Sequence, residues 1–475
     1  MKSVCLFLLA TCSHLATYCQ SSKIDYKEAL NIIDVWIQAQ RDFDKLPGIA
    51  VSVVNDQEII FSKGYGMADT ENKIAMQPET IFSICSISKL FTSIAIMQLW
   101  EQGKLRLDDS INAVLPNYNL KQQYTETVPV TIRSLLTHSS GLPREAAYPY
   151  WSGPDFQFPS IKEINEKLGS QQTLYPSSTL FQYSNLGMSL LGEAITSVSK
   201  IQYEDYVLKN ILQPLQLTNT NPFLAKHLWR GKMCTGYSAL YRDGSRKMLP
   251  FFQANGINAA AGYSSNVIDL ARFASWQFRL LKGEQKEILK SSTLKEMQRV
   301  QWMNPDGKLT WGLGFVVDQQ ADKTFVGHGG SCPGYRTSLL LSPKTRLATS
   351  VMINAGGTDP DKYGTAIFDL LYRAKEMSDT STNKINMQDY AGTYDNYTWG
   401  GETVVMPWKG KLAVFAVPSV SPAKSMQLYK YVSKDNFKRV LPNDDGLGEE
   451  LRFERDANGN ITRLQSHNNF RNKLK

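Results

Sequence analysis

The order of the predicted elements constrains the fold of this chain more than any other sequence feature. A helix predicted over Tyr26–Asp44 is followed by GIAVSVVNDQEIIFSKGYG, which is typical of two strands joined at Asn55-Asp56. A long region of predicted helices comes next, and WGLGFVVD, YRTSLLLSP and LATSVMINA then predict further strands. Strands on both sides of a helical region indicate a sheet built from both ends of the segment, which places the chain in the α+β class.

A polar segment, KEMSDTSTNK, separates this region from a C-terminal stretch with a different pattern. The segment follows a helix predicted near Tyr363–Ala374 and has no periodicity, so residues 376–384 are predicted to be a linker. Beyond it, short alternating bursts such as KLAVFAV and the hairpin signal Asn458-Gly459 predict a small antiparallel β-barrel-like domain over residues 385–475. The 475 residues therefore divide into a main domain, residues 20–375, and this smaller one.

The N-terminal stretch MKSVCLFLLATCSHLATYCQ contains a short apolar run centred on Leu6–Ala10. The run is shorter than the roughly 20 residues that cross a bilayer. Residues 1–19 are therefore predicted to be a signal peptide, with a buried N-terminal helix as the alternative, and no integral membrane span is expected in the mature chain. The predicted location is the periplasm or the exterior; lipid attachment at Cys12 or Cys19 is less favoured, because neither follows a good lipoprotein pattern.

Cysteine content and net charge limit which cofactors and partners are expected. Outside the leader the cysteines are Cys85, Cys234 and Cys332, an odd and sparse set that predicts neither a disulfide framework nor a metal site. The sequence contains no His-Glu-x-x-His and no Cys-x-x-Cys, so no metal or other cofactor is implied. The net charge of +8 is spread along the chain, and nucleic acid is therefore not an expected partner.

The stretch FSICSISKLFTSIAIMQLW, residues 82–100, places Ser86 and Lys89 one helical turn apart at the start of an apolar helix. Ser-x-x-Lys alone is weak evidence, because it also begins at Ser197, Ser292, Ser381 and Ser421. Ser86, however, stands at a helix N-terminus, where unpaired N–H groups and the helix dipole favour a developing anion. A solvated lysine would be expected to point away from the apolar stripe, whereas Lys89 lies between Ile87 and Leu90. The context favours a nucleophile and its base over a helix cap.

Two downstream stretches add further candidates: LFQYSNLGMSLLG contains Tyr183 and Asn185, and GHGGSCPGYRTSLLLSP contains His328. With TIRSLLTHSSGLP and GKLRLDDSINAVLP, they make residues 45–375 resemble the serine β-lactamase-like hydrolases. The nearest branch is that of class C β-lactamases, D-alanyl-D-alanine carboxypeptidases and related esterases, which are penicillin-binding-protein-like. The resemblance implies a β-lactamase/transpeptidase-like fold: an antiparallel sheet flanked by helices, an all-helical region, and a site in the cleft between them.

The resemblance also implies roles for individual residues. Ser86 would be the nucleophile, and Lys89 and Tyr183 would transfer the protons. A neutral Lys89 or a Tyr183 phenolate could each act as the base, and the sequence leaves both open. Lowering a lysine pKa by about three units costs about 4 kcal/mol, which burial beside a helix N-terminus can supply.

Asn185, His328, Gly330 and Ser331 are the implied substrate-binding residues, with the backbone N–H groups of Ser331 and the nucleophile as an oxyanion hole. Where lactamases and carboxypeptidases carry Lys-Thr-Gly, this chain has His328-Gly329-Gly330. An imidazole is only partly charged near neutrality and Gly329 has no hydroxyl, so a substrate carboxylate should be recognised less well. Esters or amides without a free carboxylate are favoured over efficient β-lactam turnover.

The predicted function is that of an exported serine hydrolase acting through an acyl-enzyme on a small molecule or peptide. One alternative is a D-alanyl-D-alanine carboxypeptidase or D-amino-acid peptidase, whose substrates would include peptidoglycan fragments. An alternative of another class is a penicillin-binding sensor that is acylated without turnover, or a cell-wall binding protein. Survival of Ser86, Lys89, Tyr183 and Asn185 together argues against a decayed site.

Two features have a structural as well as a functional interpretation. Residues 143–180 are aromatic and irregular, which is typical of a long functional loop or of a side-chain cluster packed beneath a loop. His138 lies near a predicted helix end, and packing is expected there in preference to catalysis.

Overall fold

The computed structural model describes most of the chain, namely residues 24–229, 231–283, 286–320, 323–377, 385–441 and 446–474. The predicted leader, residues 1–19, lies outside the described residues, and so do residues 378–384 of the predicted linker.

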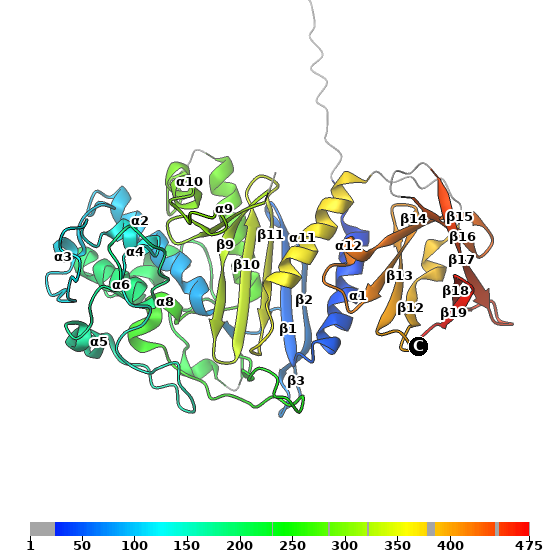
Figure 1. Ribbon diagram of the computed structural model, residues 1–475, viewed down its shortest axis with the longest axis horizontal. Coiled ribbons are helices and arrows are strands. Elements are labelled where there is room, and N and C mark those ends of the chain that lie inside the picture. Colours follow the sequence, from blue (N-terminus) through cyan, green and yellow to red (C-terminus); the bar gives the residue numbers. More distant parts are fainter. Residues whose placement is uncertain are drawn as a thin grey trace, which may run out of the picture.

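Within the described residues, a nine-stranded antiparallel sheet stands in the middle of the main domain (Figure 1). Its order is β3-β2-β1-β11-β10-β9-β8-β7-β6, and β1 (Gly48–Asn55) pairs with β11 (Leu347–Ile353). This pairing confirms the predicted sheet built from both ends of the domain. The other strands are β2 (Glu58–Asp69), β3 (Ile74–Ala75), β6 (Trp302–Met303), β7 (Thr310–Trp311), β8 (Val316–Gln320), β9 (Lys323–Cys332) and β10 (Tyr335–Ser342).

Both faces of the sheet are covered by helices. Successive side chains of a strand point to opposite faces, so each strand contributes to two cores. In β1, Ile49 and Val51 join one apolar core with helices α1 (Lys27–Phe43) and α11 (Asp361–Glu376). Ala50 and Val54 join the other core, with α9 (Val267–Lys282) and the helical region. Two covered faces account for the continuous apolar runs in these strands.

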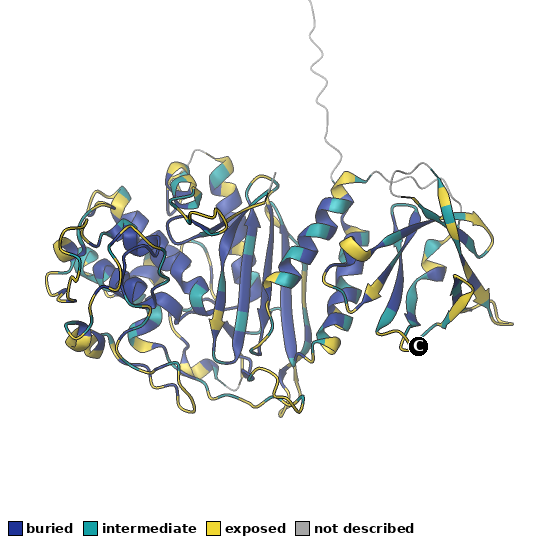
Figure 2. Cartoon of the chain, in the orientation of Figure 1, coloured by how far each residue is buried: buried dark blue, intermediate teal, exposed yellow. Residues whose placement is uncertain are grey.

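The helical region is organised around α2 (Ser88–Glu101), in which every residue from Ser88 to Leu99 is buried (Figure 2). A 3-10 turn, η1 (Cys85–Ile87), leads directly into it. The helix is therefore central, as predicted. Around it lie α3 (Ile111–Val114), α4 (Ile132–Leu136), α5 (Ile161–Leu168), α6 (Asn185–Ser199), α7 (Tyr203–Val207), α8 (Asn258–Ala261) and α10 (Ser291–Gln298). Short elements η2 (Leu208–Leu212), η3 (Lys226–Leu228), η4 (Asn255–Ile257), β4 (Phe82–Ser83) and β5 (Ser264–Ser265) complete the region.

The C-terminal part forms an eight-stranded antiparallel sheet, in the order β12 to β19 within the described residues. A bridge between Tyr394 and Lys473 brings its first and last strands together, so the sheet is barrel-like. The strands are β12 (Gly392–Asp395), β13 (Glu402–Trp408), β14 (Lys411–Val417), β15 (Gln427–Ser433), β16 (Asn436–Val440), β17 (Leu447–Arg455), β18 (Ile461–Ser466) and β19 (Asn469–Asn472), with α12 (Pro422–Ser425) and η5 (Met387–Tyr390). The predicted α+β fold with a small C-terminal β domain is confirmed.

One sequence prediction was wrong: the sparse cysteines do form a disulfide, between Cys85 and Cys332. The partners are 247 residues apart in sequence, and β9 brings Cys332 beside the turn that contains Cys85. No local spacing could have indicated this pair. The third cysteine of the described residues, Cys234, is a buried free thiol.

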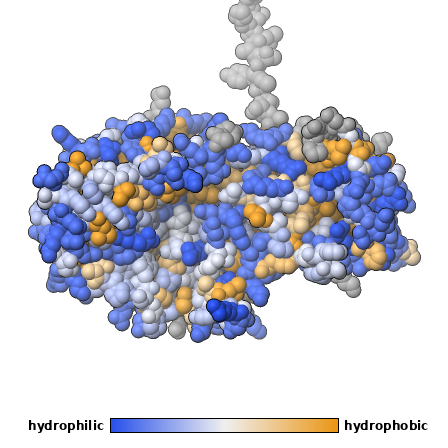
Figure 3. Space-filling view, in the orientation of Figure 1, coloured by the Kyte–Doolittle hydropathy of each residue, from blue (hydrophilic) through white to orange (hydrophobic). Residues whose placement is uncertain are grey.

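Polar residues dominate the face of the molecule seen in Figure 3, where apolar residues form small scattered groups. In the part of the chain that the structure describes, no helix combines the length and apolarity needed to cross a membrane.

Candidate active site

Ser86 lies at a sharp turn between β4 and α2. The residue before it, Cys85, has a φ of 49°, in the left-handed region that a non-glycine residue adopts only when its surroundings hold it there. Thr337 of β10 donates a hydrogen bond to the carbonyl of Ile84 at 3.1 Å, and the disulfide ties Cys85 to β9. The turn is thus braced by the sheet, and Ser86 faces a cleft of about 680 Å³.

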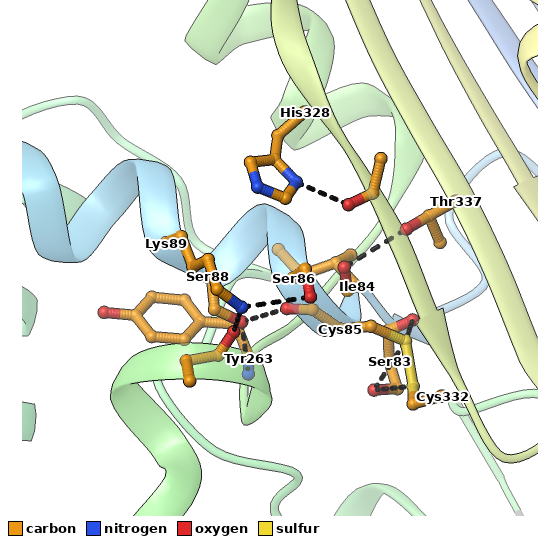
Figure 4. Close-up of a disulfide and its surroundings, with 12 residues drawn as sticks. Ser83, Ile84, Cys85, Ser86, Ser88, Lys89, Tyr263, His328, Cys332 and Thr337 are labelled. Atoms are coloured by element: carbon orange, nitrogen blue, oxygen red, sulfur yellow. Dashed lines mark hydrogen bonds between the residues drawn. A yellow bond between two sulfur atoms is a disulfide. The ribbon is translucent and has the colours of Figure 1, made fainter. Parts of the chain in front are cut away.

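Lys89 is fully buried, and its amino group lies beside the Ser86 hydroxyl (Figure 4). The Lys89 Nζ is 3.1 Å from Ser86 Oγ, 2.8 Å from Asn185 Oδ1 and 2.8 Å from the carbonyl oxygen of Ala260 in α8. Burial lowers the pKa of Lys89 well below its usual value; Glu145 raises this pKa and Arg144 lowers it. Ser86 and Lys89, which the sequence predicts to be a functional pair, are therefore in direct contact.

The Lys89 amine has three oxygen partners, and the burial that lowers its pKa favours the neutral form, which has two N–H bonds and one lone pair. Asn185 Oδ1 and the Ala260 carbonyl are acceptors only, so each takes one N–H bond. Lys89 Nζ also donates to Ser86 Oγ, which is the one partner of the three with a proton of its own, so in the neutral amine this hydrogen bond can reverse. The arrangement can accept a proton from the Ser86 hydroxyl.

Tyr183 lies just before α6, and its ring contacts the Lys89 amine, the Arg144 guanidinium and the His138 ring. Lys89 Nζ lies 4.7 Å and the Arg144 guanidinium carbon 4.8 Å from the ring centroid, and the His138 ring stacks at 4.2 Å. Burial raises the pKa of Tyr183 well above its usual value, and a hydrogen bond with Ser86 opposes this. The phenol is thus held neutral and can donate or relay a proton.

Asn185, the first residue of α6, connects Lys89 to a carboxylate. Its Nδ2 donates to both carboxylate oxygens of Glu145, at 2.8 and 3.1 Å. Arg144 forms an ion pair with Glu145 at 3.2 Å, and Tyr150 donates a hydrogen bond to the same carboxylate. Sequence reasoning missed Arg144 and Glu145, although two adjacent opposite charges in an otherwise aromatic segment were a usable signal.

His328 in β9 is buried against Trp311, with ring centroids 5.5 Å apart, and its Nδ1 lies 2.5 Å from the Gly329 carbonyl oxygen. Burial and the neighbouring Lys89 lower the pKa of His328 to about 3. The expected partly charged imidazole is therefore corrected to a neutral one, because the ring has lost its contact with water.

Gly330 and Ser331 continue the same strand along the cleft. A side chain at Gly330 would place its Cβ 2.1 Å from Thr337 Oγ1 and 2.3 Å from the Ile84 carbonyl oxygen, so the close approach of β9 to the nucleophile turn requires glycine. Ser331, which precedes the disulfide residue Cys332, is exposed and lines the cleft.

His138 is buried beneath the site rather than directed into it. Its Nδ1 accepts a hydrogen bond from the Ser184 backbone N–H at 3.2 Å, and the ring packs between Tyr183 and Trp311. These contacts match the packing expected from the sequence.

The aromatic segment has no helix or strand before α5, and its buried aromatic side chains pack into the main core. Tyr150 and Phe158 are buried in the main core, and Phe158 stacks on Phe252 at 5.3 Å. Through the Tyr150 hydroxyl the segment also reaches Glu145, so it supports the site from behind.

The candidate residues converge in one place. Ser86, Tyr183, His328, Gly330 and Ser331 line the cleft, while Lys89 and Asn185 lie buried at its base. Among the described residues, no group of three or more His, Cys, Asp or Glu side chains could hold a metal ion.

Comparison with known proteins identifies the family of the chain. Residues 33–374, well over half of the chain, match the Beta-lactamase family. The chain belongs to the beta-lactamase family. The matched residues include the nine-stranded sheet, the helical region and the residues that line the cleft. The match ends within α11, before the barrel-like sheet.

Individual relatives are distant. Beta-lactamase-like protein 2 of Dictyostelium discoideum is 28% identical over 361 residues, covering 74% of this chain and 63% of the relative. The chain thus spans less than two thirds of that protein. The octameric penicillin-binding protein homologue from Pyrococcus abyssi has a TM-score of 0.65 at 25% identity, covering 93% of this chain and 99% of that one. The D-amino acid amidase from Ochrobactrum anthropi SV3 shares the fold, with a TM-score of 0.59, 24% identity and coverage of 73% and 97%.

Proposed function

We propose that this member of the beta-lactamase family is a serine hydrolase that forms an acyl-enzyme on Ser86. The observation that carries the proposal is the buried Lys89, whose Nζ has two acceptor-only partners and the Ser86 hydroxyl at 3.1 Å. As Ser86 Oγ bonds to the substrate carbonyl carbon, its proton passes to Lys89. The bond to the leaving group then breaks, and the leaving alcohol or amine takes up a proton through Tyr183. Water later hydrolyses the acyl-enzyme.

Lys89 is the better candidate for the base. Burial lowers the pKa of Lys89 and raises the pKa of Tyr183, so a neutral amine beside a neutral phenol is the favoured pair. A Tyr183 phenolate would have to form against its own desolvation. The backbone N–H groups of Ser86 and Ser331 are the proposed oxyanion hole, since both residues line the same cleft.

The proposed substrates are esters or amides without a free carboxylate beside the scissile bond. His328, at the position where many relatives have lysine, has a pKa of about 3 and carries no charge at neutral pH. Arg144 and Arg336 line the cleft, but Asp359 and Asp361 line it as well. At the position where many relatives have a lysine, the cleft therefore has no concentrated positive charge that could bind a substrate carboxylate.

We also propose that the protein is exported. Disulfides persist in oxidising compartments and are rare in the reducing cytosol. The Cys85–Cys332 disulfide is therefore consistent with an oxidising compartment outside the cytosol. This supports the signal peptide that the sequence predicts.

Covalent labelling tests the proposed nucleophile. A fluorophosphonate should add one phosphonyl group per chain, as the Ser86 Oγ–P bond forms and fluoride leaves, and intact mass measures the addition. Ser86→Ala should remove the label and lower kcat on a p-nitrophenyl ester by at least about 1000-fold. Ser292→Ala, in another Ser-x-x-Lys sequence, is the matched control and should label fully. A label that survives Ser86→Ala would remove Ser86 from the nucleophile role.

Substrate choice needs a separate panel. We expect turnover of neutral esters and amino acid amides, and poor turnover of D-alanyl-D-alanine peptides. Stable acylation without product release would instead favour the penicillin-binding sensor.

A further inference from the structure

Asn185 is held in one orientation by partners of opposite chemistry. Its Oδ1 accepts a hydrogen bond from Lys89 Nζ at 2.8 Å, while its Nδ2 donates to both carboxylate oxygens of Glu145. A carboxylate only accepts hydrogen bonds, so a reversed amide would set oxygen against oxygen at Glu145 and N–H against N–H at Lys89. Glu145 therefore decides which atom of Asn185 meets Lys89.

Glu145 is itself fixed in place. The Tyr150 hydroxyl donates to its carboxylate, and Arg144 pairs with it at 3.2 Å. Tyr150 is 1% exposed and packs against Phe158, with ring centroids 5.1 Å apart. The buried Tyr150 thus anchors the carboxylate to the packing of the aromatic segment.

The charged and titratable groups that face Lys89 from the surrounding segments are His138, Arg144, Glu145, Tyr183 and His328. Burial keeps both histidines and the tyrosine uncharged near neutral pH. The helix α8 contributes the Ala260 carbonyl. The charges that remain are Arg144 and Glu145, which act on the Lys89 pKa in opposite directions.

We propose that Glu145 is a positioning residue: it holds the Asn185 amide with its carbonyl toward Lys89, and the Arg144–Glu145 ion pair tunes the protonation of Lys89 from outside the reacting atoms. The inference rests on the proposed function, in which neutral Lys89 takes the Ser86 proton. Glu145 lies behind Asn185 and is not among the residues that line the cleft.

The test is the pH profile of kcat/KM on a neutral ester. Activity needs neutral Lys89, so the acidic limb reports its protonation. Glu145→Gln removes the charge that raises the Lys89 pKa, and the limb should move to lower pH by roughly one unit. Arg144→Gln removes the charge that lowers this pKa, and the limb should move to higher pH. General damage to the fold would not shift the limb in opposite directions for two neighbouring residues.

Two further variants separate charge from anchoring. Glu145→Asp keeps the carboxylate and should restore the limb toward that of the wild type. Tyr150→Phe removes an anchoring hydrogen bond without changing charge, so kcat should fall while the limb stays in place. For Glu145→Gln, kcat should also fall, with KM unchanged.

The inference and the proposed function can fail separately. An unmoved limb in Glu145→Gln, or shifts of the same sign in Glu145→Gln and Arg144→Gln, would overturn the role of the ion pair even where Ser86→Ala abolishes labelling. Labelling that persists in Ser86→Ala would overturn the proposed function and this inference with it.

Discussion

At the scale of single residues, the proposed preference for substrates without a free carboxylate depends on His328. Its ring is buried between Trp311 and the cleft, and with a pKa of about 3 it stays neutral through the whole range in which a hydrolase would be assayed. Titration of His328 should therefore produce no limb in the pH profile of kcat/KM. If the wild-type profile has a limb that is lost in His328→Gln, this expectation is wrong.

Restoring the family's charge at this position should change substrate preference. His328→Lys should raise kcat/KM for a substrate with a free carboxylate, relative to its methyl ester, by roughly tenfold, which is the worth of one hydrogen bond to a charged group. The measurement is the ratio of kcat/KM for the two substrates in one enzyme preparation, because this ratio does not depend on the fraction of active enzyme. His328→Gln adds no charge and should leave the ratio unchanged. An equal ratio in His328→Lys would show that the carboxylate is recognised elsewhere.

The sequence could predict residues whose role depends on local spacing, and it missed residues whose role depends on a loop. Ser86 and Lys89 are three residues apart, and the continuous run from η1 into α2 brings them together. Glu145 reaches Asn185 because Tyr150 packs into the core behind it, and no periodic pattern encodes that packing.

At the scale of elements, β9 and the nucleophile turn form one unit. The sequence predicted the strands on either side of β9 but not β9 itself, because Gly327, Gly329 and Gly330 interrupt the side-chain alternation that identifies a strand. Gly330 allows the close approach to the nucleophile turn, and the disulfide from Cys332 to Cys85 joins the two elements covalently. The disulfide residues are immediate neighbours of Ser331 and Ser86.

Reducing this disulfide should lower both stability and turnover. The crosslink closes a very long loop, and its loss should decrease the free energy of unfolding by about 2–4 kcal/mol. Denaturant titration with and without reductant measures that loss, and kcat should fall with it as β9 is released from the turn. Cys332→Ala should begin at the reduced level and show no further response to reductant. Wild-type kcat after complete reduction would limit the disulfide to a role in stability.

At the scale of the whole molecule, the barrel-like domain and the main domain share an apolar core. Trp408 of β13 and Trp36 of α1 are both fully buried in it, and the Ser419 backbone N–H donates to Gln40 Oε1 at 3.0 Å across the contact. The described cleft-lining residues all come from the main domain, from Ser86 to Asp361 at the start of α11. We therefore propose that the barrel-like domain contributes to stability rather than to substrate binding.

Two tryptophans of the barrel-like domain make this assignment testable. Trp408→Ala removes a side chain that is 0% exposed and should cost about 3–5 kcal/mol of unfolding free energy, because it leaves a cavity in the shared core. Trp399→Ala changes a side chain that is 86% exposed and should leave stability within about 0.5 kcal/mol of the wild type. Below its unfolding temperature, Trp408→Ala should keep the kcat/KM of the wild type on both short esters and longer peptide amides, since no contact in the cleft is lost. A selective loss on the longer substrates would mean that the barrel-like domain takes part in substrate binding.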